Sequence, residues 1–125
     1  MVIVLRVLAG LAALIFTVQG IQWIAAPAAV AESLGMPLLQ GTAASTQIGD
    51  LGSFFLVGGL MMALGQLPGR SGWLYPPALL VLGAAVMRTL AALVGYADFA
   101  PEFIVPEVIM GVILVATARR LASSG

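Results

Sequence analysis

Three ionisable residues lie within stretches of this chain that are otherwise apolar, and they carry most of its chemical information: Asp50, Arg88 and Glu107. A guanidinium at the depth of lipid tails costs about 3 kcal/mol on insertion scales, so such a group is found paired or in contact with water. The two carboxylates are the only anionic side chains in comparable stretches. The sequence therefore predicts a buried ionic cluster in which Arg88 contacts Glu107, Asp50 or both.

The composition fixes the class of protein in which this cluster occurs. The chain has 125 residues, of which 62% are hydrophobic and 8% are charged, whereas soluble domains carry about 25% charged residues. We expect a single integral membrane domain over residues 1–125, with the lipid bilayer as its surroundings. The absence of His and Cys excludes disulfides, thiol catalysis, Cys/His zinc sites and His-ligated haem. No cofactor or metal site is expected for this reason. No nucleic-acid partner is expected either, because the net charge is zero and no basic tract is present.

The chain divides into four apolar segments that approach the length of about 20 residues needed to cross a bilayer. Between the first two, Pro27 is typical of a helix start and Gly35 of a helix end, which predicts a short interfacial helix. Ser45 or Thr46 is expected to cap the second span. The predicted fold is an all-α, up-down bundle of four transmembrane helices with this short helix between helices one and two. The predicted spans are 2–26, 47–66, 73–96 and 101–121.

The distribution of arginine predicts the orientation in the membrane. If the spans alternate in direction, the exposed basic residues all fall on one side, and the other side carries only acidic loop residues. The positive-inside rule then places both termini in the cytoplasm of a bacterial-type inner membrane. The basic residues are Arg6, Arg70, Arg119 and Arg120, and the acidic loop residues are Glu32, Asp98 and Glu102.

Helix rise places polar groups from all four spans in the same layer. At about 1.5 Å per residue, Arg88 lies about 22 Å from Trp73 and about 12 Å from Tyr96, in the outer half of the membrane. We expect a partly hydrated pocket there and a dry, closed inner half. The predicted pocket residues are Gln19, Gln22, Trp23, Gln47, Asp50, Arg88, Tyr96 and Glu107. The dry inner half contains Leu11, Phe16, Leu60, Met61, Leu79, Val81 and Leu114.

The ionic cluster has two interpretations that the sequence leaves open. Buried ion pairs often contribute little net stability and serve instead to fix helix register, so the cluster can be a structural clamp. Ionisable groups within membrane spans also mark binding sites and proton pathways. Neither a nucleophile nor a phosphate-binding loop accompanies the carboxylates, so we do not expect an enzyme.

Several short segments give the chain a family resemblance. The end of the first span, "GIQWIAAP" at 20–27, and the block "GDLGSFFLVGGL" at 49–60 resemble an uncharacterised branch of the DoxX-like superfamily. An Arg late in span three, here Arg88, and a Glu early in span four, here Glu107, are also similar. The resemblance implies a compact four-helix bundle, and it covers nearly the whole chain. DoxX-type members are similar to subunits of quinone-reducing or redox-stress complexes, but this chain lacks cysteine, so thiol chemistry cannot be carried over.

Three functions are compatible with these features. The first is a non-catalytic module whose outward-facing pocket binds a small amphipathic ligand, such as a quinone or lipid headgroup, or a partner subunit. The second is a small proton-coupled transporter that acts as a homo-oligomer, with Glu107 as the titrating group. The third is a purely structural subunit of a membrane complex. A cavity open to the outer side distinguishes the first from a dry, closed ion cluster.

Overall fold

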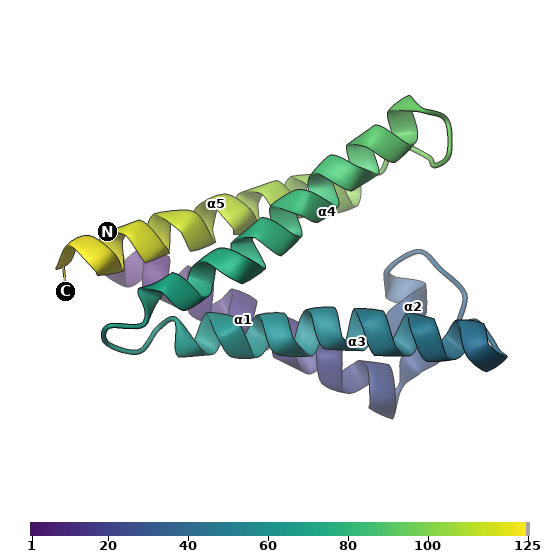
Figure 1. Cartoon of the computed structure of the whole chain (residues 1–125), viewed down its shortest axis with the longest axis horizontal. Coiled ribbons are helices and arrows are strands. Elements are labelled where there is room, and N and C mark those ends of the chain that lie inside the picture. The colour runs from purple at the N-terminus through teal and green to yellow at the C-terminus, as the bar shows by residue number, and fades with distance from the viewer. Residues whose placement is uncertain (125) are drawn as a thin grey trace.

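The computed structural model describes residues 1–124, and every regular element in this part of the chain is a helix. The chain runs up and down four times, so both termini and the turn before η1 lie at one end (Figure 1). We call this the termini end, and we call the opposite end, which holds α2 and the loop after α4, the α2 end. The elements are α1 (Val2–Ala25), α2 (Pro27–Ser33), α3 (Gly41–Leu64), η1 (Ser71–Leu74), α4 (Tyr75–Leu93) and α5 (Pro101–Ser124).

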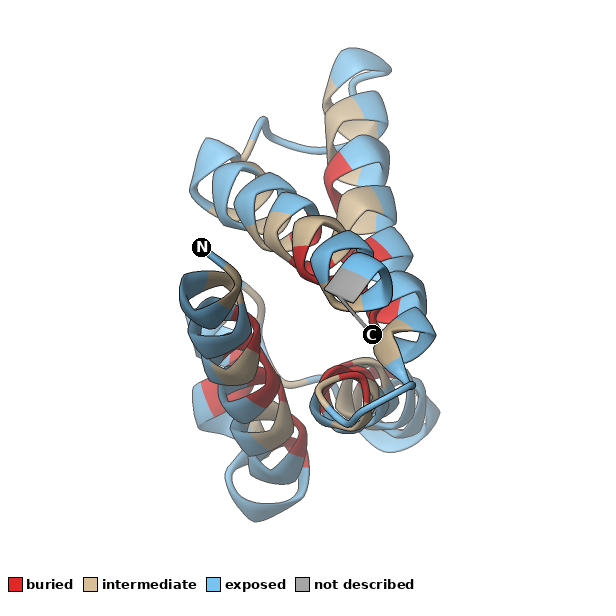
Figure 2. Ribbon diagram, turned by 90° about the vertical axis from the view of Figure 1, so that its left-hand side faces the viewer, coloured by how far each residue is buried: buried red, intermediate tan, exposed pale blue. Residues whose placement is uncertain are grey.

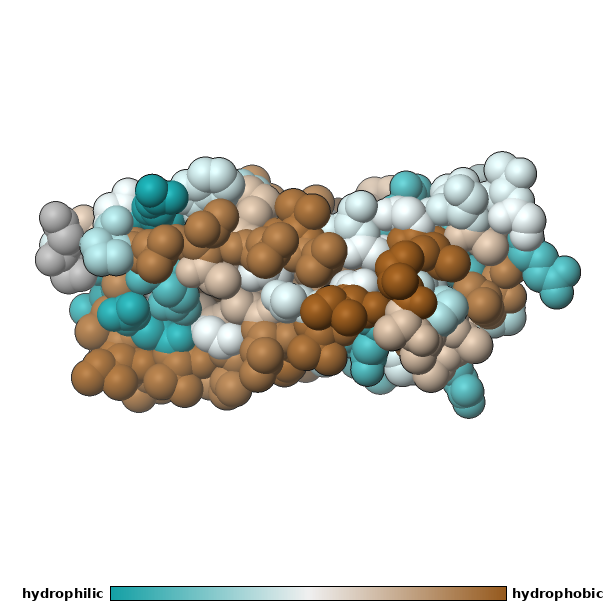
Figure 3. Space-filling model, turned by 90° about the horizontal axis from the view of Figure 1, so that it is seen from below, coloured by the Kyte–Doolittle hydropathy of each residue, from teal (hydrophilic) through white to brown (hydrophobic). Residues whose placement is uncertain are grey.

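Four helical segments are long and apolar enough to cross a membrane: α1, α3, η1 joined to α4, and α5. Their outward faces carry large apolar side chains, among them Ile3, Leu14, Val57 and Met87. Broad apolar bands therefore cover the surface in Figure 3. A water-soluble chain of this size could not expose such a surface. The protein is an integral membrane protein with the predicted all-α architecture.

The first hairpin, α1 with α3, packs through close backbone contact. A Cβ atom placed on Gly20 would overlap the backbone of Leu56, and one placed on Gly59 would overlap Thr17. Small residues at such crossings let membrane helices approach and gain dispersion energy, since lipid supplies no hydrophobic drive between helices. These glycines, with the aromatic residues beside them, position α1 and α3 as one unit.

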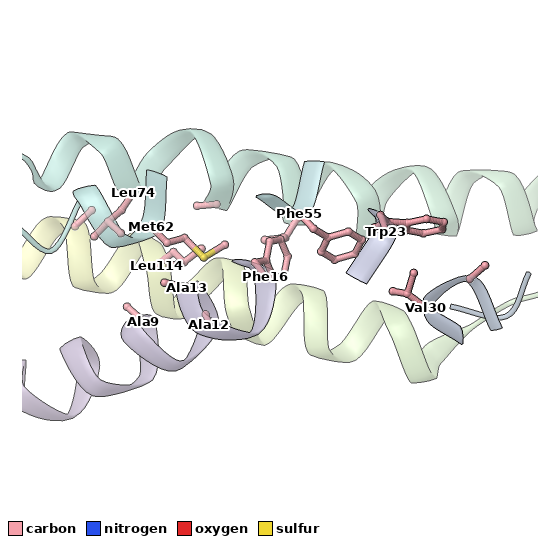
Figure 4. Close-up of a cluster of buried hydrophobic side chains, with 14 residues drawn as sticks. Ala9, Ala12, Ala13, Phe16, Trp23, Val30, Phe55, Met62, Leu74 and Leu114 are labelled. Carbon is pink, nitrogen blue, oxygen red and sulfur yellow. The ribbon is translucent and has the colours of Figure 1, made fainter. Parts of the chain in front are cut away.

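The core runs along the facing sides of the helices (Figure 2). Its centre is a cluster of three rings in which Phe16 lies 4.9 Å from Phe55 and 5.7 Å from Phe54 between centroids. Met62 and Leu114 fill the layer toward the termini end (Figure 4). The Thr117 hydroxyl donates to the carbonyls of Ile113 at 2.7 Å and of Leu5 at 3.3 Å, which ties α5 to α1.

The second hairpin, α4 with α5, also relies on a glycine. A Cβ atom on Gly111 would overlap the Leu82 side chain, so α4 lies directly against α5 there. The two hairpins meet near the termini end, where Leu74 of η1 packs on Gly65. Toward the α2 end, α4 diverges from α3 in both ribbon views (Figures 1 and 2). The half of the bundle that holds Arg88 is thus the less tightly joined half.

The structure confirms the short helix that starts at Pro27 and the turn at Gly35, whose φ is +79°. The predicted cap of the second span is wrong, because α3 begins at Gly41 and both Ser45 and Thr46 lie inside it. Gly41 has φ +60°, a conformation that glycine adopts without strain. The loop can therefore turn directly into the helix several residues earlier than the polar residues suggested.

The residues of the inner half divide between the core and the lipid-facing surface. Phe16, Val81 and Leu114 are buried as expected, but Leu11, Leu60 and Leu79 are 50%, 49% and 68% exposed. These three leucines lie on outward faces, where lipid covers them. Hydropathy alone does not separate the two faces of a membrane helix, because lipid and protein interior are equally apolar.

Candidate functional site

The centre of the candidate site is an ion pair between α4 and α5. Arg88 Nε donates hydrogen bonds to both carboxylate oxygens of Glu107, at 3.0 Å and 3.2 Å. The Arg88 side chain is 37% exposed and that of Glu107 is 17% exposed. This contact confirms the prediction that Arg88 meets a carboxylate. Among residues 1–124 it is the one salt bridge between side chains.

An aromatic ring also contacts the guanidinium of Arg88. Arg88 Cζ lies 4.8 Å from the centroid of Phe103, within the range in which a cation is attracted to a ring face. Phe103 precedes Glu107 by four residues, so both project from the same face of α5. A Cβ atom on Gly35 would lie 3.9 Å from the Phe103 ring, so the turn after α2 packs on it.

The sequence reasoning missed Phe103, although a signal for it was present. The spacing of four residues to Glu107 in a continuous helix places its ring beside the carboxylate. Our prediction considered only polar partners for the guanidinium. A ring face is equally suitable for a planar, weakly hydrated cation.

The geometry leaves most of the hydrogen-bonding capacity of Arg88 unused. Glu107 occupies Nε, while within residues 1–124 the two terminal nitrogens, Nη1 and Nη2, donate no hydrogen bond to the protein. A guanidinium has five N–H donors in a fixed planar fork. The guanidinium of Arg88 is therefore fixed in position and partly exposed, and its terminal N–H groups can still donate hydrogen bonds to an oxygen of another molecule.

Asp50 does not join this pair. It is exposed on α3 and makes no hydrogen bond or ion pair with the described residues. Of the two carboxylates that we considered as partners of Arg88, the contact is therefore made by Glu107 alone. The reason is rotational, because residues at equal depth on different helices meet only if both face the same interior, and Asp50 lies on an outward side of α3.

Gln47 has a structural contact that the sequence analysis did not foresee. It is buried, and its side-chain oxygen accepts from Leu39 N at 2.9 Å, while its Nε2 donates to Pro37 O at 3.0 Å and to Met36 S at 2.9 Å. The side-chain amide of Gln47 thus provides hydrogen-bond partners for backbone groups of the loop before α3. This role accounts for its polarity without a ligand.

The remaining predicted residues lie in different surroundings. Trp23 is fully buried in the core, and its Nε1 has no hydrogen-bond partner among the described residues. Gln19 is half-buried and Gln22 is exposed, while Tyr96 is 88% exposed in the loop after α4. Hydrogen bonds and ion pairs within residues 1–124 thus join only Arg88 and Glu107 of the predicted set.

Two cavities are lined by other residues. One, of about 290 Å³, is an apolar groove between α4 and α5 lined by residues such as Leu82, Ala85, Ile104 and Val108. The other, of about 470 Å³, lies at the termini end beside Arg6 and Gln66. Neither is lined by Arg88 or Glu107.

Comparisons of the chain with protein-family models, with curated proteins and with solved structures gave no match. The function is therefore inferred from the geometry of the site.

Proposed function

We propose that the protein is a non-catalytic membrane module in which Arg88 binds a small amphipathic ligand through its terminal nitrogens. The observation that carries the proposal is the unused fork of a guanidinium that is fixed by Glu107 and Phe103 and is still 37% exposed. Arg forms charge-assisted hydrogen bonds to carbonyl, carboxylate and phosphate oxygens. A quinone carbonyl or a lipid headgroup supplies such an oxygen, and a carboxylate of a partner subunit could take the same place.

The divergence of α4 from α3 supports this assignment. It leaves the half of the bundle around Arg88 less tightly packed than the half near η1 (Figures 1 and 2). Ligands of membrane proteins are bound between helices by a few polar groups in apolar surroundings. The long tail of a quinone or lipid would lie along apolar faces such as the groove between α4 and α5.

The test measures ligand binding by matched arginine variants. A quinone with a ten-carbon tail would be titrated into the purified protein, and native mass spectrometry would count the adducts. Arg88→Lys keeps the charge and the pairing with Glu107 but loses the planar fork. We expect its affinity to fall about tenfold, as for the loss of one charge-assisted hydrogen bond. Arg70→Lys, at the termini end, is the control.

Equal binding by wild type and Arg88→Lys would contradict the proposal, as would the absence of any adduct in protein extracted with its native lipids or after quinone titration. Either result would favour the second candidate, a purely structural subunit in which the ion pair fixes helix register. The observation that favours this second function is the ion pair with Glu107, in which Arg88 Nε is shared between both carboxylate oxygens and the two charges offset each other.

We also propose membership of the DoxX-like superfamily and a location in a bacterial-type inner membrane with both termini in the cytoplasm. The four-helix bundle and the positions of Arg88 and Glu107 on adjacent helices support the family proposal. The exposed arginines at the termini end support the orientation, since positive residues are retained on the cytoplasmic side.

A further inference from the structure

A second arginine is held in place at the termini end. Arg6 Nε donates to Gln66 Oε1 at 3.2 Å and Arg6 Nη2 donates to the Gln66 carbonyl at 3.2 Å. In return, Gln66 Nε2 donates to the Arg6 carbonyl at 3.0 Å. These three bonds join the first turns of α1 to the residues after α3. They fix the position of the guanidinium without neutralising its charge, because glutamine is uncharged.

This arginine borders the cavity of about 470 Å³ at the same end. Polar groups of Arg6, Gln66 and Ser71 line one part of it, and the turn 67–69 with residues 121–122 lines the rest. Its volume falls within the range of small-molecule sites, about 300–1,000 Å³. Arg6 lies about 6 Å along α1 from Val2, which corresponds to the headgroup region rather than the lipid tails.

The cavity retains free donors and a positive potential. Within residues 1–124, Arg6 Nη1 and the Ser71 hydroxyl donate no hydrogen bond to the protein. Arg70, Arg119 and Arg120 are exposed at the same end. The five acidic side chains lie in the half of the bundle toward the α2 end, so within residues 1–124 no acidic side chain offsets this charge. Figure 3 shows hydrophilic residues gathered beside the apolar bands at the termini end.

We propose that this cavity binds the phosphate group of an anionic phospholipid, with Arg6 and Ser71 as donors and the apolar wall against the glycerol region. A fixed guanidinium suits phosphate because its planar fork donates two parallel hydrogen bonds. Basic pockets between transmembrane helices take acidic lipid headgroups in this way. The site is independent of Arg88 and lies at the opposite end of the bundle.

The experiment follows thermal unfolding of the full chain in detergent while phosphatidylglycerol, phosphatidylcholine or inorganic phosphate is added. We expect phosphatidylglycerol alone to raise the Tm in a saturable manner. Arg6→Gln should raise its half-saturating concentration about tenfold, and Ser71→Ala about threefold, as for a charged and a neutral hydrogen bond. Arg119→Gln, which removes the same charge outside the cavity, should leave it unchanged. Arg88→Lys should also leave it unchanged.

Three results would overturn the proposal. Equal effects of phosphatidylglycerol and phosphatidylcholine would remove the requirement for an anionic headgroup. Equal stabilisation by inorganic phosphate would assign the cavity to free phosphate instead of lipid. Equal losses in Arg6→Gln and Arg119→Gln would reduce the effect to general surface charge. If Arg6→Gln does not fold because the contact with Gln66 is lost, Ser71→Ala decides, and wild-type binding by that variant would overturn the proposal.

Discussion

At the scale of single residues, the ion pair of Arg88 with Glu107 allows α4 and α5 to carry two charged side chains within the membrane. The carboxylate takes one edge of the guanidinium, and the Phe103 ring takes a face. Removing either partner leaves the other charge within an apolar span, which is more costly than losing the attraction itself. The stability of the bundle should therefore depend on the pair as a unit.

A double-mutant cycle tests this dependence. Arg88→Ala should reduce the free energy of unfolding by roughly 3 kcal/mol if the carboxylate of Glu107, which is mostly buried, stays charged without its partner. The double variant Arg88→Ala with Glu107→Ala should lose less than the sum of the single variants, with a coupling of about 1–3 kcal/mol. Unfolding in detergent, followed by circular dichroism, provides the measurement. Additive losses would show that the two side chains do not stabilise each other, and Arg120→Ala serves as the exposed control.

The sequence predicted that Arg88 contacts Glu107, Asp50 or both, and it could not exclude Asp50 for a physical reason. A short loop joins α4 to α5, so the depth of a residue in the membrane can be counted along both helices from the same loop. Residues at equal depth on the facing sides of α4 and α5 must therefore come into contact. Asp50 belongs to the other hairpin, whose rotation depends on Gly20, Gly59 and the ring cluster. Depth along a helix can be counted from the sequence, whereas rotation about its axis depends on all packing partners.

At the scale of elements, glycines decide which helices approach closely. Gly20 allows α1 to contact the backbone of α3, whereas a Cβ atom on Gly10 of the same helix would meet no atom within 4 Å. The sequence shows both as glycine in an apolar stretch. Only the structure distinguishes a glycine required by packing from one that faces lipid.

This difference gives a matched pair of variants on one helix. Gly20→Ala should destabilise the bundle by about 1–3 kcal/mol, since the added methyl group meets the backbone at Leu56, which cannot move aside as a side chain would. Gly10→Ala should be neutral or slightly stabilising, because alanine favours the helix by about 1 kcal/mol. Thermal unfolding of both variants in the same detergent is the measurement. Similar losses in both would contradict the close contact of α1 with α3.

The loop before α3 shows where reading elements from the sequence fails. Gln47 was assigned to the pocket because it is polar and lies at the right depth, yet it bonds to the backbone of residues Pro37 and Leu39. The earlier helix start at Gly41 brings the amide within reach of that loop. In a membrane protein, unsatisfied backbone groups compete for every polar side chain, so polarity in a span is not by itself a sign of a ligand.

At the scale of the whole molecule, the two ends differ in charge and in packing. The termini end carries arginines without acidic partners and is tied by Arg6 to Gln66. The α2 end carries the acidic residues, and there the hairpins diverge (Figure 1). The two proposed sites reflect this asymmetry. The cavity beside Arg6 lies where the positive charge has no acidic partner, and the ligand site at Arg88 lies where the helices are less tightly packed. The composition predicted a membrane bundle, because that property follows from sums over many residues.

The topology of the chain can be tested in two separable steps with reporters inserted at Gly69, inserted at Asp98 or fused after Gly125. The fold requires the reporters at Gly69 and after Gly125 to lie on the same side of the membrane and the one at Asp98 on the other, whichever way the bundle is inserted. Disagreement on this point would contradict the four-span architecture.

The orientation in the membrane is the second step. Arg6, Arg70, Arg119 and Arg120 all lie on the side of Gly69, so a fluorescent protein there should be cytoplasmic and alkaline phosphatase at Asp98 should be active outside. The reverse result would preserve the fold but place the phosphate cavity of Arg6 on the outer face, and with it the arginines that now support a cytoplasmic location.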